Sequence, residues 1–190
     1  MVLISARRLS PLALVLALAL TAGLAACIGA RAPERLPTPT PIAVHVWLDG
    51  PDASGMTPPA AFVARLDAAL GERNLVPAHP PSPLPARDLV TTDRRLAAVR
   101  AAVPEPAHAL LVEARVTFFS QISGRYRWDV DVRATIATSA SSSRSDTIGV
   151  AAFLQYAHEG APEALDFVAR QVVSAVAALV DRHLEAAAAP

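Results

Sequence analysis

The sequence predicts an α/β (α+β) domain in which a mixed, mostly antiparallel sheet is packed by two or three helices. Three observations predict it: apolar residues that alternate with polar ones, apolar residues at helical spacing, and turn residues between the two kinds of pattern. The expected order is strand, helix, possible short strand, helix, three strands and a long final helix. We expect this single domain to span residues 42–185.

The first half of the domain alternates strand and helix. Residues 42–48 predict a strand, and the sequence Asp49-Gly50-Pro51 ends it. Thr57 is the expected N-cap of a helix whose first turn holds two prolines and whose end is marked by Gly71. Leu75-Val76 is a possible short strand after that helix.

A Pro-rich loop and a second helix follow. Residues 77–87 contain five prolines, so we expect a loop there. The next helix is expected to begin near Thr92 or Asp93, and prolines at 104 and 106 end it.

Residues 109–136 predict a β-hairpin, because period-two alternation continues on both sides of Ser123-Gly124. We expect a three-residue loop, Ile122-Ser123-Gly124, because it pairs Val116 with Val130 and Phe118 with Trp128, so that the apolar faces of the two strands match. A two-residue loop would place apolar residues of one strand opposite polar residues of the other. A register shifted by two from the expected one would place Arg115 opposite Arg133, and like charges in that position are unfavourable. One face of the hairpin is charged and forms our candidate interaction face: Arg115, Arg127, Asp129, Asp131 and Arg133.

The last third predicts one more strand and the longest helix. After a polar connection at Ser139–Ser145, residues 147–156 predict a strand with Tyr156 pointing inward. Pro162 opens a helix, and residues 186–190 are an Ala-rich tail that we expect to fray. Its apolar stripe is Leu165, Val168, Val172, Val176, Leu179 and His183.

The amino terminus has the three parts of an export signal. Arg7 and Arg8 supply positive charge, and residues 11–24 form an apolar run that is shorter than the roughly 20 residues of a spanning helix. The run ends in Leu24-Ala25-Ala26-Cys27, which resembles a lipobox, the cleavage site of bacterial lipoprotein precursors.

The resemblance implies that residues 1–26 are a cleaved signal peptide and that Cys27 carries lipid, including a fatty acyl chain such as palmitate. As the only cysteine, Cys27 cannot form an internal disulfide. Asp after the cysteine retains lipoproteins at the inner membrane, whereas Ile28 and Gly29 stand here, so we expect the periplasmic face of the outer membrane. Two alternatives are an uncleaved anchor with Cys27 in the core, and a twin-arginine export signal at Arg7-Arg8.

Residues 27–41 are rich in proline and predict a tether between the lipid and the domain. Alternating proline favours a semi-rigid polyproline II spacer, although plain disorder would give nearly the same reach. Without residues 1–26 the chain keeps 15 Arg against 17 acidic residues, a balance near −2. This charge disfavours nucleic acid as a partner.

No pattern in the sequence indicates an enzyme, a metal or a cofactor. His45, His79, His108, His158 and His183 are scattered without metal-ligand spacing, and we interpret His45 and His183 as packing or interface residues. No Gly-x-Ser-x-Gly motif and no phosphate-binding glycine loop occur. Asp129 and Asp131 could form a carboxylate pair, but their Arg neighbours favour a solvated ion-pair ladder.

The order of elements over residues 42–185 resembles the envelope α/β domains of the curli-secretion lipoprotein, of the penicillin-binding-protein activator LpoB and of the TolB amino-terminal domain. Residues 42–46 stand at the opening strand of those domains, and residues 107–114 stand at the strand after the second helix. The resemblance implies a binding or scaffolding domain, and it assigns no functional residues.

Two functional classes follow. In the first, the domain is a protein-interaction module with an envelope protein as partner, and it uses the charged hairpin face or the loop at 77–87. In the second, it binds a small or lipidic ligand between the sheet and the last helix, in a groove lined by Phe118, Trp128, Leu154 and Val172. The sequence does not predict the oligomeric state.

Overall fold

The computed structural model describes residues 35–49, 56–80, 91–138 and 143–188. The expected signal peptide, Cys27 and the first part of the tether lie outside these residues. The elements in chain order are β1 (Thr40–Asp49), α2 (Ala60–Gly71), β2 (Leu75–Ala78), α3 (Thr92–Ala101), β3 (His108–Ile122), β4 (Arg125–Thr138), β5 (Ser143–Leu154) and α4 (Ala161–Ala188).

The described strands form one five-stranded sheet in the order β2-β1-β3-β4-β5. β1 pairs in parallel with β2 and β3, whereas β3, β4 and β5 form an antiparallel meander. The antiparallel ladders are the longer ones. This mixed sheet with its helices confirms the predicted fold class and the predicted order of elements.

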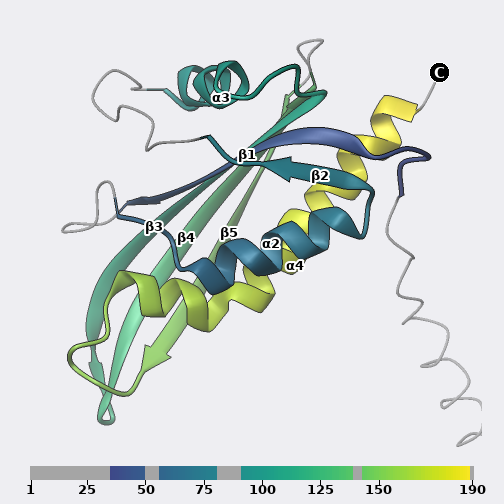
Figure 1. The fold of residues 1–190 in the computed structure, drawn as a ribbon. Helices are drawn as coiled ribbons and strands as arrows, with labels where there is room; N and C mark the ends of the chain where they lie inside the picture. The colour runs from purple at the N-terminus through teal and green to yellow at the C-terminus, as the bar shows by residue number, and fades with distance from the viewer. Residues whose placement is uncertain (1–34, 50–55, 81–90, 139–142, 189–190) are drawn as a thin grey trace, which may run out of the picture. The chain divides into compact units, whose positions relative to one another are not determined.

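Helices cover both faces of the sheet, but not equally. α2 and α4 lie on one face and α3 lies on the other (Figure 1). Leu110 and Val112 of β3 therefore pack in the main core under α4, while Ala109 and Leu111 pack in a smaller core under α3. The predicted stripe of α4 is confirmed, since its members are all buried: Leu165, Val168, Val172, Val176, Leu179 and His183.

The register of the β3–β4 hairpin is as predicted from His108 to Phe118, but its end and its loop are not. Val116 pairs with Val130 and Phe118 pairs with Trp128, as expected. Between Phe118 and Ser120 the register shifts by one residue, so that Ile122 pairs with Arg125. The loop therefore has two residues, Ser123 at φ 50° and Gly124 at φ 77°. A bulge at Phe119, which the alternation does not reveal, reconciles this short loop with the expected register.

The start of α2 also differs from the prediction. Its N-cap is Pro59 rather than Thr57, and no side chain caps the helix. A residue that precedes proline is disfavoured in the helical region, which keeps Thr57 and Pro58 outside the helix. α3 begins at Thr92 as expected, and the Thr91 side chain accepts a hydrogen bond from the Arg94 N–H at 3.3 Å.

The end of the expected tether is attached to the domain. The Leu36 N–H donates to the Arg73 carbonyl at 3.1 Å, and the Asn74 side-chain amide donates to the Leu36 carbonyl at 2.6 Å. The Thr40 N–H then donates to the Asn74 carbonyl at 2.9 Å, so β1 begins two residues earlier than predicted. Asn74 has φ 59°, a left-handed conformation that Asn tolerates better than most residues. The chain thus enters the domain at the turn between α2 and β2.

Candidate interaction surface

The charged hairpin face that the sequence predicts lies on the side of the sheet that faces away from α4. Arg115 pairs with Asp131 in the ladder, and both residues are exposed, as is Arg133. Arg127 and Asp129 lie along the same strand, where the guanidinium Nη2 and the carboxylate Oδ1 are 3.0 Å apart. The five residues of the candidate interaction face therefore share one surface.

Glu113 marks the border of this face. In the ladder it pairs with Arg133, as expected. Its carboxylate, however, forms an ion pair with Arg95 of α3 and accepts a hydrogen bond from the Thr92 hydroxyl at 3.1 Å. α3 thus covers the sheet up to Glu113 and leaves it open from Arg115 to the end of the hairpin.

The hairpin extends beyond the strand next to it. Asp49, the last residue of β1, pairs with Arg115, and β3 continues from there to Ile122 without β1 beside it. At about 3.3 Å per residue, β3 places its far end roughly 45 Å from His108. This end carries exposed aromatic side chains on both faces of the sheet.

On the α4 side, Phe118 packs against Trp128, with ring centroids 5.3 Å apart, and it remains 46% exposed. On the other side, the bulge places Phe119 under Arg127, whose guanidinium lies 4.3 Å from the ring centroid. Tyr156, which we expected to point inward, is 54% exposed because β5 ends at Leu154 and the chain turns away from the core. We call the side chains gathered here the distal surface: Phe118, Phe119, Ile122, Arg127, Phe153 and Tyr156.

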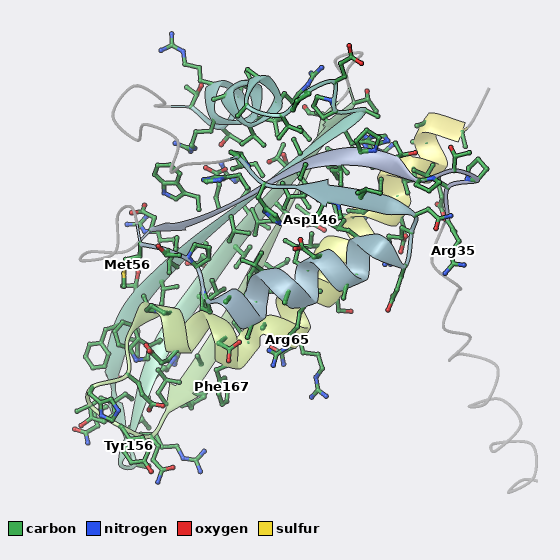
Figure 2. All side chains as sticks on the ribbon, in the orientation of Figure 1. Arg35, Met56, Arg65, Asp146, Tyr156 and Phe167 are labelled. Atoms are coloured by element: carbon green, nitrogen blue, oxygen red, sulfur yellow. The ribbon has the colours of Figure 1, made fainter. Side chains whose placement is uncertain are left out.

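The distal surface and the chain entry lie at opposite ends of the domain. Figure 2 shows Arg35, the first described residue, at one end and Tyr156 at the other. The Arg35 side chain donates to the Glu72 carbonyl at 3.0 Å, so the entry is held at the end of α2.

A groove lies between α2 and α4. It measures about 810 Å³, and its lining includes Ala69, Phe167, Arg170 and Ala177. Its charged groups are largely paired with one another, Arg65 with Asp166 and Arg73 with Asp181. The ligand groove that we expected from the sequence was to lie between the sheet and α4, but Leu154 and Val172 are packed in the core there.

Two histidines that are far apart in the sequence, His108 and His183, meet near the carboxyl-terminal end of α4. The rings of His108 and His183 pack edge to face with centroids 5.6 Å apart. Both side chains are buried, and neither His108 Nδ1 nor His183 Nε2 has a hydrogen-bond partner among the described residues. Burial lowers the pKa of both groups, and the charges of His108 and Arg144 lower the pKa of His183 further. His183 is a packing residue, as we interpreted it.

The other three histidines are not part of this pair. His79 Nε2 lies 3.0 Å from Asp67 Oδ2, and the His158 ring stacks on the Tyr156 ring. Burial, and secondarily the charge of His79, lowers the pKa of His45 in β1. Within the described ranges, no three His, Cys, Asp or Glu side chains are grouped to hold a metal ion. None of the described helices combines the length and apolarity that a membrane crossing requires.

Comparison with known proteins shows no match to a protein-family model and no match to a curated protein. Solved structures do resemble the chain. The hypothetical protein CT253 from Chlamydia trachomatis superposes with a TM-score of 0.47 at 12% identity, over 74% of this chain and 97% of that one. Lipoprotein GNA1162 from Neisseria meningitidis gives 0.45 at 15% identity, over 75% and 98%.

The PelC dodecamer from Paraburkholderia phytofirmans gives a TM-score of 0.41 at 11% identity, over 79% of this chain and 92% of that one. The three names include a lipoprotein and no enzyme. The more specific resemblance to the curli-secretion, LpoB and TolB domains stays a prediction. The chain is thus similar in arrangement to several bacterial proteins, a lipoprotein among them.

Proposed function

We propose that the mature chain is a lipid-anchored lipoprotein that faces the periplasm, at the outer membrane, and acts as a non-enzymatic protein-interaction module of an envelope assembly. The anchor rests on the lipobox-like Leu24-Ala25-Ala26-Cys27. Two or three acyl chains on Cys27 would hold the protein at a bilayer firmly, because each buried CH₂ contributes about 0.8 kcal/mol.

The distal surface is the observation that carries the interaction role. Exposed aromatic residues next to arginine are the composition that protein interfaces favour. Phe119, Phe153 and Tyr156 are each more than a third exposed, and Arg127 is already placed over the Phe119 ring. The candidate interaction face continues from there along the open side of the sheet and would supply charged contacts around an apolar centre.

The place where the chain enters the domain supports the interaction role of the distal surface. Because Arg35 and Leu36 are held at the end of α2, lipid at Cys27 would approach the domain at that end. Only residues 28–34 would separate them, about 25 Å of extended chain. The distal surface, at the opposite end, would then be free to meet a partner in the periplasm.

Crosslinking in cells tests this proposal. A photoreactive amino acid at Phe119 should give one discrete protein adduct in the membrane fraction, and Arg127→Glu in the same chain should reduce that adduct at least fivefold. The same photoreactive group at Ala97, an exposed position on α3, serves as the control and should not give the adduct. Adducts to lipid alone at position 119, or equal protein adducts at both positions, would contradict the proposal.

Ligand binding is the second candidate function, and the groove between α2 and α4 is the feature that favours it. Its volume suits a small molecule, and Phe167 is 61% exposed at its wall. Its ion pairs, however, already satisfy most of the charges that would orient a ligand. Native mass spectrometry of the purified lipidated protein should show only the mass of the chain with its covalent lipid, whereas a retained small molecule that is lost on Phe167→Asp would favour this second function.

A further inference from the structure

The two edges of the sheet differ in how they are protected. β2 has only four residues and includes Pro77, which cannot donate a hydrogen bond, and both features discourage pairing with another strand. β5 has 12 residues and no proline. No described strand pairs with the side of β5 that faces away from β4. β5 is therefore a long open edge.

One side-chain contact shows which backbone groups point outward from β5. The Thr147 N–H donates to the carboxylate of Asp146 at 2.9 Å, so it does not point toward β4. Backbone direction alternates along a strand, so Gly149, Ala151 and Phe153 also turn their N–H and C=O groups outward. Arg182 of α4 holds Asp146 at 2.7 Å, which keeps the Thr147 donor occupied. The open part of the edge therefore begins after Thr147.

The open part is also uncharged and nearly self-complementary. Residues 148–154 read Ile-Gly-Val-Ala-Ala-Phe-Leu, with no charged side chain. Ile148 and Val150 are partly exposed, and Phe153 is 39% exposed. An uncharged apolar edge of this length is a known site for strand addition.

We propose that β5 pairs antiparallel with β5 of a second copy of this chain, with Ala151 opposite the same residue of the second copy. Two copies related by a two-fold axis must pair outward-facing residues with outward-facing residues. Centring on Ala151 places Phe153 opposite Gly149, Ile148 opposite Leu154 and Val150 opposite Ala152. Moving the centre one step toward the amino terminus would oppose Leu154 to Asp146, and a second step would oppose Phe153 to Ser145.

Gly149 fits this register. Its missing side chain leaves room for the Asp131 carboxylate, whose Oδ1 lies 3.3 Å from the position that a Cβ would take. It also leaves backbone uncovered on the outer face, and an aromatic ring from the opposite strand is a known way to cover such a glycine. Phe153 of the second copy would supply that ring and would become buried in turn. This inference shares Phe153 with the distal surface, and its test rests on the proposed lipid at Cys27.

A single added cysteine tests the register in the full lipidated protein. In a hydrogen-bonded antiparallel pair the Cα atoms are about 5.5 Å apart, within the range of a disulfide. Lipid on Cys27 occupies the only native thiol, so Ala151→Cys would add one free thiol per chain. Mild oxidation of membranes should then convert most of the protein to a disulfide-linked dimer.

Thr147→Cys is the matched control, since it lies on the same strand with the same outward direction. In the proposed register the two copies of position 147 are eight residues apart, roughly 26 Å, and should give at least tenfold less dimer. Ala151→Pro removes an N–H that points outward and leaves the hydrogen bonds to β4 intact. It should therefore leave the thermal midpoint of unfolding nearly unchanged. In light scattering of the detergent-solubilised protein, it should abolish the dimer. Equal crosslinking at 151 and 147, a monomer at 151, or a disulfide from 151 to a different protein would overturn the proposal.

Discussion

Arg73, just beyond α2, and Asp181 of α4 form a two-pronged ion pair. Nε lies 2.7 Å from Oδ1 and Nη2 lies 2.8 Å from Oδ2. The Arg73 guanidinium also donates to the Ala69 carbonyl at 2.7 Å, and its backbone carbonyl accepts the N–H of Leu36. One residue therefore joins α2, α4 and the point where the chain enters the domain.

Because the Arg73 side chain is only 8% exposed, removing its partner leaves a buried charge. We expect Asp181→Ala to lower the free energy of unfolding by about 3 kcal/mol. Arg65→Ala, which breaks the exposed pair with Asp166, is the control and should cost less than about 1 kcal/mol. Urea denaturation of both variants measures the difference, and equal losses would show that the Arg73 pair is no more than a surface contact.

The two-residue loop of the hairpin gives a second prediction. Gly124 has φ 77°, a conformation that strains a residue with a side chain, although no atom would clash with a Cβ there. Gly124→Ala should therefore destabilise the protein by about 1 kcal/mol. Ser123→Asn, at φ 50°, should stabilise it by a few tenths of a kcal/mol because Asn-Gly suits this turn. An unchanged free energy of unfolding for Ser123→Asn would instead indicate a three-residue loop.

The buried histidine pair predicts a dependence of stability on pH. Burial and the nearby charges of His108 and Arg144 lower the pKa of His183, whereas its unfolded pKa stays near 6.5. As the pH falls below about 6.5, the unfolded chain binds a proton that the folded chain does not, so the free energy of unfolding falls. Above that pH the contribution is complete and constant.

His183→Leu should remove part of this slope, because one titrating group is lost while the site stays apolar. Thermal denaturation at pH 7.5 and at pH 5.5 gives the difference in midpoint for the natural chain and for the variant. A smaller difference in the variant is expected. The same difference in both would mean that His183 takes up its proton equally in the folded and unfolded states.

The sequence predicts the fold well where a pattern of faces decides it. Alternation and the charges of Glu113, Arg115 and Asp131 were sufficient for the register of the hairpin, because a wrong register would place like charges together. The stripe of α4 followed from helical spacing alone. The bulge at Phe119 could not be predicted, since one extra residue changes the loop length without changing the pattern on either side.

The candidate site was harder to predict because it depends on where the elements end. Tyr156 was expected to point inward and Phe118 to line a groove, yet both are exposed because β5 stops at Leu154 and the hairpin runs past β1. The His108–His183 pair arises from the packing of α4 on β3, and no local spacing indicates it. In the sequence, Phe119 and Arg127 were visible only as residues on the two predicted strands of the hairpin, with no sign that they lie next to each other.

Mass spectrometry of the natural protein, purified from cell membranes, would show whether Cys27 carries the lipid anchor. We expect a mature chain that begins at Cys27 and carries a thioether-linked diacylglyceryl group on its sulfur. Cys27→Ser should block both the modification and this cleavage and should reduce the membrane-bound fraction several-fold. A free thiol at Cys27, or a chain that still begins at Met1, would show that the protein is not anchored by lipid at this residue.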